Sequence, residues 1–125
     1  MIIGIVNANL EATIRLIVRG AQGQGQEHEI EAVIDTGFTG SLTLPAELIA
    51  ALGLAWRGHA QAELADGSLY LFDVYAATVL WDDQVRMVEL DATDTNPLVG
   101  MGLLHGYDLR IQVVERGRVT IEVLP

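Results

Sequence analysis

Apolar and polar residues alternate along much of this sequence, and that alternation restricts the fold more than any other feature. In residues 11–19, apolar side chains occupy every second position, which is the spacing of a β-strand with one buried face. The same spacing returns in residues 108–113 and 118–123, and residues 115–118 between them are typical of a hairpin turn. The sequence therefore predicts a mainly β fold. The predicted buried faces comprise Ala12, Ile14, Leu16 and Val18, then Leu109, Ile111 and Val113, and then Val119, Ile121 and Val123, with Thr13 and Arg15 on the opposite, exposed face.

The longest predicted unit is a hairpin, residues 55–80, that folds back at residues 65–68. Its Asp66-Gly67 pair is among the strongest signals for a two-residue hairpin turn. Residues 81–84 then turn the chain into another strand. The other predicted strands lie at residues 28–34, 41–44 and 85–90, and loops are predicted at residues 20–27 and 91–96.

Only two short segments favour a helix. Residues 45–52 begin with a proline, which suits the first helical position, and end before Gly53, which can adopt the left-handed conformation that ends helices. Leu48, Ile49 and Leu52 share one face of this predicted helix. Glycines at both ends of residues 98–106 frame one or two further helical turns.

Length and charge narrow the classes of function. The 125 residues predict a single domain, residues 1–125, and 50% hydrophobic residues suffice for a buried core. No apolar run reaches the ~20 residues of a membrane-spanning helix. Seventeen acidic residues against seven basic ones give a net charge of −10, so we expect no nucleic-acid partner and no membrane-surface partner. The first residues lack a signal-peptide pattern, and we therefore expect a cytoplasmic protein.

Missing residue types narrow the chemistry further. Cysteine and lysine are both absent, which excludes thiol nucleophiles, disulfides, thiolate metal sites and Schiff-base chemistry. His28, His59 and His105 are scattered without the spacing of metal ligands on a helix, so we expect no metal site. Carboxylates are therefore the most available catalytic groups.

Asp35 stands out among the carboxylates because it follows an apolar strand and precedes Thr36 and Gly37. A glycine at this place lets the backbone turn sharply, so that the carboxylate can project from the end of a rigid sheet. A strand-end aspartate that closes an Asx turn has the same local pattern. These three residues alone therefore leave both a structural and a catalytic role open.

Farther along the chain, Leu98, Val99 and Gly100 form a second motif, and the two motifs together resemble those of the retropepsin-like aspartic proteases. In that family a catalytic Asp-Thr-Gly is followed by a hydrophobic-hydrophobic-Gly motif before a short helix, with a flap hairpin between them. The flap tip corresponds here to residues 64–67. The resemblance covers nearly the whole chain and extends to the small single-domain bacterial members. It implies a closed β-barrel half-lobe with a flap hairpin and one or two short helices.

The resemblance also implies a role for each motif residue. Asp35 is the implied catalytic residue. The implied supports of its loop are Thr36, through a hydrogen bond across a dimer axis, and Gly37, Leu98, Val99 and Gly100. The implied flap residues over the substrate are Ala65, Asp66 and Gly67. Phe38 departs from the family, whose better-known members carry a small residue here, so we expect its ring to narrow or reshape the substrate cleft.

An aspartic protease needs two carboxylates that share one proton. This chain has one Asp-Thr-Gly, because Asp94-Thr95-Asn96 lacks the glycine and does not follow an apolar strand. The resemblance therefore implies a homodimer in which Asp35 of each copy takes part in activating water to hydrolyse a polypeptide, with no cofactor. Apolar alternating strands at residues 2–6 and 119–124 are expected to join the two copies in one sheet.

Two other classes of function fit parts of the pattern. A dimeric module of the same fold that binds a peptide or a protein without cutting it would retain Asp35 for structure, and the fold does not separate it from the enzyme. A purely structural oligomerisation domain needs no ionisable group at its two-fold axis, so Asp35 argues against that class. The hairpin at residues 55–80 is compatible both with a flap and with an ordinary hairpin of a barrel.

Overall fold

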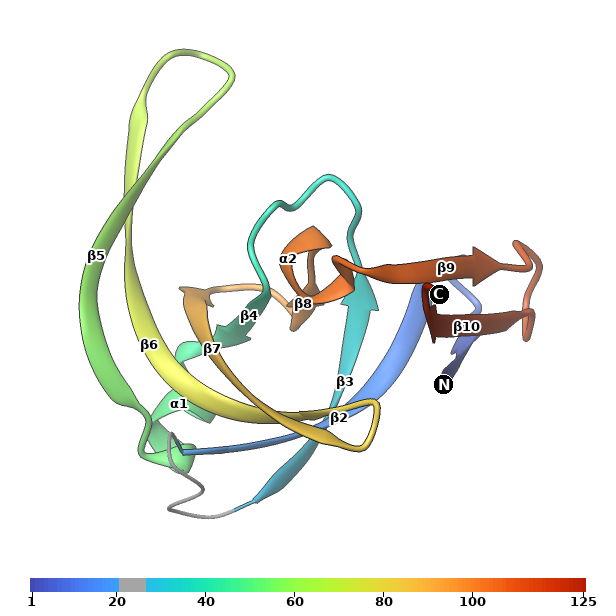
Figure 1. The fold of residues 1–125 in the computed structure, drawn as a ribbon. Helices are drawn as coiled ribbons and strands as arrows, with labels where there is room; N and C mark the ends of the chain where they lie inside the picture. Colours follow the sequence, from blue (N-terminus) through green and yellow to red (C-terminus); the bar gives the residue numbers. More distant parts are fainter. Residues whose placement is uncertain (21–26) are drawn as a thin grey trace.

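The computed structural model describes residues 1–20 and 27–125. Within them, ten strands form one strongly curled sheet that is accompanied by two short helices (Figure 1). Most of the predicted loop at residues 20–27 lies outside the described residues. The elements in chain order are β1 (Ile2–Val6), β2 (Ala12–Gly20), β3 (His28–Ile34), β4 (Leu42–Pro45), α1 (Ala46–Leu52), β5 (Ala55–Glu63), β6 (Leu69–Trp81), β7 (Gln84–Thr93), β8 (Leu98–Val99), α2 (Met101–Leu104), β9 (Tyr107–Ile111) and β10 (Arg118–Val123).

The sheet closes into a barrel because β2 pairs with β3 along one edge and with β6 along the other. Hydrogen-bonded neighbours run β2-β3-β8-β4-β7-β6 and then return to β2, which makes a ring of six strands. Strands β1, β10 and β9 continue the sheet beyond this ring, at the right of the view in Figure 1. The predicted mainly β fold is confirmed.

The barrel interior is filled by the apolar faces that the alternation predicted. Ile14, Leu16 and Val18 of β2 are buried, together with side chains from the other strands of the ring and from α1. Trp81 at the end of β6 is fully buried, and its ring meets that of Tyr107 edge to face with centroids 5.8 Å apart. This contact fixes β9 to the barrel, since aromatic pairs of this geometry stabilise beyond the area that they bury.

Three residues of the expected strand faces are placed wrongly. Thr13 is buried rather than exposed, because β1 pairs beside it and its hydroxyl donates a hydrogen bond of 2.9 Å to the Ile5 carbonyl oxygen. Val113 and Val123 are exposed rather than buried, because β9 ends at Ile111, before Val113, and β10 ends at Val123 itself. The position of a neighbouring strand therefore decided burial in the first case, and the length of the strand decided it in the other two.

The two helices are short, as predicted. Pro45 ends β4 and caps α1 instead of occupying its first turn, and Gly53 ends α1 in the left-handed conformation with φ +64°. α2 has four residues, Met101–Leu104. No helix within the described residues is long and apolar enough to cross a membrane. The cytoplasmic location stays a prediction.

The terminal strands β1 and β10 pair with one another inside the same chain. β1 also pairs with β2, and β10 also pairs with β9, so that each of the two strands has neighbours on both sides. Within the single chain, the backbone groups of these strands bond to each other and to β2 and β9, and the inter-subunit sheet stays a prediction. The homodimer itself stays a prediction.

Candidate active site

The loop that carries Asp35 joins β3 to β4, two strands that are consecutive in the chain but not adjacent in the sheet. β8 lies between them, parallel to β3 and antiparallel to β4. The Asp35 amide donates a hydrogen bond of 2.9 Å to the Val99 carbonyl oxygen, and the Val33 amide donates to Pro97 over the same distance. The backbone of Asp35 is therefore fixed directly by the second motif of the sequence.

The start of α2 holds the far side of this loop, residues 35–41, which we call the Asp35 loop. Amide groups at a helix N-terminus have no partner inside the helix, so they are free to bond to a neighbouring segment. Three successive amides do so here, and they donate to three carbonyl oxygens of the loop. The bonds run from Gly100 to Ser41 at 3.0 Å, from Met101 to Phe38 at 2.8 Å and from Gly102 to Gly40 at 3.0 Å.

Gly100 lies so close to the Asp35 loop that no larger residue fits without a shift. A methyl group on Gly100 would overlap the Gly40 carbonyl oxygen and would lie 2.5 Å from Phe38 Cδ2 and 2.7 Å from the Phe38 carbonyl oxygen. The half-buried Phe38 ring also lies against Gly40, where a methyl group would come within 2.5 Å of Cζ. The Phe38 ring thus occupies the space that is left by the missing side chains of Gly40 and Gly100. The expectation that this ring narrows or reshapes a substrate cleft stays a prediction.

The half-buried carboxylate of Asp35 accepts a hydrogen bond of 2.9 Å from the Gly37 amide through Oδ1. The structural and the catalytic interpretation of Asp35 share this Asx-turn contact. A turn aspartate needs only its own loop, however, whereas this loop is held by β8 on one side and by α2 on the other. Such a second layer of support is what a preorganised reacting group requires.

The long hairpin of β5 and β6, which we call the flap hairpin, arches beside the Asp35 loop (Figure 1). At its tip the Leu64 amide donates to Ser68 and the Gly67 amide donates to Leu64, which leaves a three-residue loop with Gly67 at φ +84°. The expected two-residue turn at Asp66-Gly67 is therefore wrong, although the glycine does adopt a positive φ. A two-residue turn with two positive φ angles occurs instead at Asp82 and Asp83.

Ser68 donates to Asp66 Oδ1 twice at the flap tip, from its amide at 2.9 Å and from its hydroxyl at 2.6 Å. These bonds lower the pKa of the exposed Asp66 carboxyl, because they stabilise its charged form. The tip is therefore internally hydrogen-bonded, with its carboxylate turned toward its own backbone.

The two faces of the flap hairpin differ in chemistry. Directly opposed residues of an antiparallel pair share a face, so Ala60 with Phe72, and Ala62 with Tyr70, make one apolar face. The Tyr70 and Phe72 rings stack on it with centroids 6.2 Å apart. The other face carries charged, polar and leucine side chains, namely His59, Gln61, Glu63, Leu69, Leu71 and Asp73.

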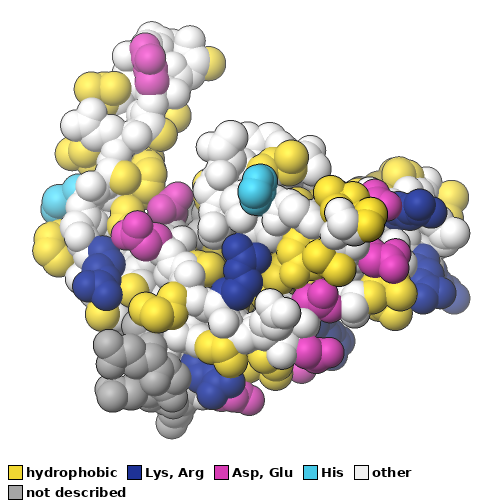
Figure 2. Space-filling model, viewed as in Figure 1, with side chains coloured by type: hydrophobic (Ala, Val, Ile, Leu, Met, Phe, Trp, Pro, Cys, Tyr) yellow, Lys and Arg dark blue, Asp and Glu magenta, His cyan; other side chains and the backbone are white. Residues whose placement is uncertain are grey.

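An open groove with a volume of about 680 Å³ lies at the foot of the flap hairpin. Gly40 and Ser41 from the end of the Asp35 loop form part of its wall, whereas Asp35 is not among the residues that line it. Figure 2 shows the hairpin standing clear of the rest of the molecule, with charged side chains gathered near its foot. The groove thus joins the flap hairpin to the Asp35 loop.

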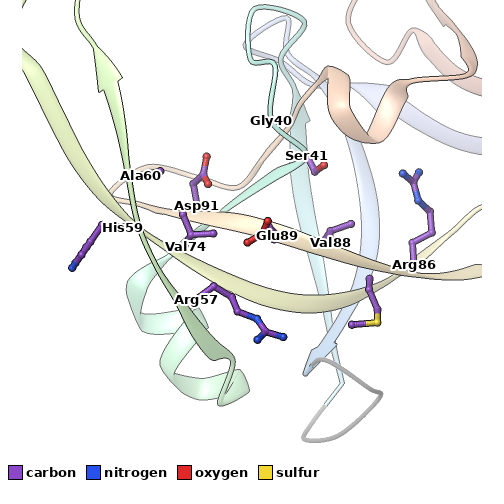
Figure 3. A pocket seen from close by; sticks show the side chains of 11 residues that line it. Gly40, Ser41, Arg57, His59, Ala60, Val74, Arg86, Val88, Glu89 and Asp91 are labelled. Carbon is purple, nitrogen blue, oxygen red and sulfur yellow. The ribbon is translucent and has the colours of Figure 1, made fainter.

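Charged side chains of both signs line this groove (Figure 3). They are Arg57 of β5 and Arg86, Glu89 and Asp91 of β7. Arg86 also donates to the Leu103 carbonyl oxygen at 3.3 Å and so connects β7 to α2. No motif in the sequence marks these residues. The polar positions that alternate with Val88 and Leu90 in β7 were the available signal, but they do not reveal what the polar face meets.

Asp91 provides a test of the electrostatics of the groove. Burial raises the pKa of its carboxyl, and the nearby negative charge of Glu89 raises it further. A carboxyl whose pKa is higher in the folded chain than in the unfolded chain destabilises the fold when it is ionised. This loss of stability disappears once the pH falls below the pKa of the carboxyl in the unfolded chain, about 4, because the group is then protonated in both states. We therefore expect Asp91→Asn to raise Tm by about 1–3 °C at neutral pH, and to give no gain at about pH 3.5.

The matched control is Asp94→Asn, since Asp94 is an exposed aspartate three positions farther along. Thermal unfolding of both variants at the two pH values measures the difference. A gain for Asp91→Asn that persists unchanged in acid would contradict this account of the groove.

The described part of the chain, residues 1–20 and 27–125, contains no group of three or more histidine, aspartate or glutamate side chains that could hold a metal ion.

Comparison with known proteins bears on this arrangement. No family model matches the chain, and no curated protein matches it in sequence. Among solved structures, a retropepsin-like aspartic protease from Rickettsia conorii is similar, with a TM-score of 0.62 over 98% of this chain and 89% of that one, at 17% identity. This chain has the retropepsin-like fold. The predicted fold class, a closed barrel with a flap hairpin and short helices, is thereby confirmed.

The retropepsin-like fold brings some of the predicted site residues together and leaves others apart. Asp35, Thr36 and Gly37 share one loop with Leu98, Val99 and Gly100 directly behind it. The flap residues Ala65, Asp66 and Gly67 lie at the exposed tip of the hairpin, and their bonds within the described residues are to that tip alone. The functional roles of all these residues stay predictions.

Proposed function

We propose that this protein is an aspartic-type endopeptidase that works as a homodimer. One observation carries the proposal: the Asp35 carboxylate stands on a loop that is pinned by β8 and α2, beside a groove that the flap hairpin borders. The similarity of the fold to a retropepsin-like aspartic protease supports the same reaction class.

The reaction needs a second carboxylate, and this chain supplies one Asp-Thr-Gly. In the proposed dimer, Asp35 of each copy approaches the other to about 3 Å, where the two groups share one proton because both cannot be ionised. The ionised carboxylate accepts a proton from water, which attacks the scissile carbonyl carbon, while the protonated carboxyl donates to the carbonyl oxygen. Thr36 is exposed beside Asp35, as a contact across the axis requires.

The proposed substrate is an extended polypeptide, and no cofactor takes part. A peptide between the flap hairpin and the Asp35 loop would bond to backbone groups of the hairpin, as in other cases of strand addition. The apolar flap face with Phe72 and Tyr70 suits apolar side chains near the cut. Closure of the hairpin would then exclude water from the reacting groups.

Cleavage of a diverse peptide library, with and without a statine-type transition-state mimic, tests the proposal. We expect cleavage that the mimic inhibits, and a dimer in sedimentation at micromolar concentration. A strict monomer that still cleaves peptides would contradict the shared pair of carboxylates. Peptide binding without any cleavage would instead favour the non-catalytic binding module of the same fold.

A further inference from the structure

The stem of the flap hairpin contains a β-bulge. Trp56 pairs with Tyr75, but the next paired residue of β5 is Gly58, opposite Val74, so Arg57 is an extra residue in that strand. Gly58 has φ +133°, a conformation that residues with a side chain rarely adopt. Bulges bend a strand and redirect its side chains, and here the extra residue, Arg57, lines the groove.

The bulge also changes which residues of β5 share a face. Trp56 and His59 are three positions apart, so in a regular strand they would point to opposite sides. With the extra residue between them, Trp56 is opposite Tyr75 and His59 is opposite Asp73, and both pairs lie on the same face. His59 is itself one of the residues that line the groove, and Tyr75 of the same face packs against the hydrophobic core at the base of the hairpin.

Asp73 joins the two ring side chains across the bulge. Trp56 Nε1 donates to Asp73 Oδ1 at 3.1 Å, and His59 Nδ1 lies 3.0 Å from the same oxygen. The Trp56 and His59 rings meet edge to face with centroids 5.3 Å apart. One carboxylate on β6 therefore spans the single irregular point of β5.

We propose that Asp73 is a positioning residue, which sets the angle of the flap hairpin over the groove by joining Trp56 and His59 across the bulge at Gly58. The inference rests on the proposed function. Residues 61–69 beyond the cluster are exposed, so little other than the stem directs them. The tip lies about 20 Å beyond His59 for strands of ordinary rise. A small change of angle at the bulge therefore moves the tip by several times more than it moves the stem.

Hydrogen exchange of the hairpin amides in the purified, ligand-free protein tests the positioning directly. We expect Asp73→Ala to speed exchange of residues 56–74 about five- to tenfold, as the loss of the Trp56 hydrogen bond and of the close contact with His59 implies. Exchange of the β2 and β3 amides should not change. Asp73→Asn should restore slow exchange, because its amide oxygen can still accept the Trp56 hydrogen bond and lie against His59. The matched control is Glu63→Ala, which removes a carboxylate from the same face of the same hairpin.

Peptide kinetics give the second readout. We expect Asp73→Ala to raise KM about fivefold with a smaller change in kcat, because a misplaced flap binds peptide less well before it affects the carboxylates. The proposal would be overturned if the hairpin amides of Asp73→Ala exchanged no faster than those of Glu63→Ala. It would also be overturned if they exchanged faster while the KM of Asp73→Ala stayed at the wild-type value. If the wild type cleaved nothing, the proposed function would fail separately, and the affinity of each variant for the statine-type mimic would replace KM.

Discussion

Replacement of Asp35 by asparagine is expected to lower kcat/KM for peptide hydrolysis by about 10²–10⁴-fold, the range in which a positioned proton-transfer group contributes. Asparagine has the shape of aspartate, and its oxygen can still accept the Gly37 amide bond that holds Asp35 Oδ1. An amide pair cannot share the proton that two carboxylates share. Steady-state kinetics on a library-derived peptide, with Tm and sedimentation beside them, therefore separate the chemistry from the fold and from the dimer.

Asp94→Asn is the matched control, because Asp94 precedes a threonine as Asp35 does but lies exposed in the chain after β7. We expect this variant to retain wild-type kcat/KM. Activity of the wild type should also fall as the pH rises toward neutrality and above, since the pair of carboxylates then loses its shared proton. Full activity in Asp35→Asn would assign catalysis to another residue, and a rate that still rises above neutral pH would exclude the shared pair.

Sequence pattern predicted the parts of this fold that depend on local spacing. The alternation in residues 11–19 fixes which side chains of β2 point inward, because the period of a strand is two. It placed Thr13 on the wrong face, since the burial of that residue depends on β1, a segment earlier in the chain that pairs beside it. Local periodicity carries no information about which strand becomes a neighbour.

The turns show the same limit. Asp66-Gly67 correctly indicated a glycine with positive φ, but the backbone bond between Leu64 and Ser68 lengthened the turn by one residue. Asp82 and Asp83, without any glycine, formed the two-residue turn instead. Aspartate tolerates a positive φ better than most residues do, so the pairing of β6 with β7 decides the turn there.

The site was predictable only in its two motifs. Asp35 and Gly100 could be selected because each stands in a short recognisable pattern, and the structure places the two segments together through β8 and α2. The groove could not be predicted, because Arg57 reaches it through a bulge and Glu89 and Asp91 come from another strand. Register and bulges arise from the pairing of whole strands, which no single segment specifies.

The second large effect is expected at Gly100, where substitution by alanine should lower the free energy of unfolding by about 3 kcal/mol, at the upper end of the usual range for overpacking. The added methyl group overlaps the Gly40 carbonyl oxygen and crowds the Phe38 ring and backbone. Both neighbours belong to the loop that α2 holds, so relief of the overlap must separate α2 from the Asp35 loop. Thermal unfolding should report a Tm about 10 °C lower.

Gly37→Ala provides the contrast for this prediction, because it adds the same methyl group to the same loop. Its nearest contact would be Asp35 Oδ1 at 3.3 Å, and Gly37 has no positive φ, so we expect its Tm to change by about 2 °C or less. The difference between the two variants then measures the close approach of α2 to the loop and not the general cost of losing a glycine. Equal Tm values for Gly100→Ala and Gly37→Ala would mean that Gly100 does not hold the Asp35 loop. The support that distinguishes the Asp35 carboxylate from that of an ordinary turn aspartate would then have to come from β8 alone.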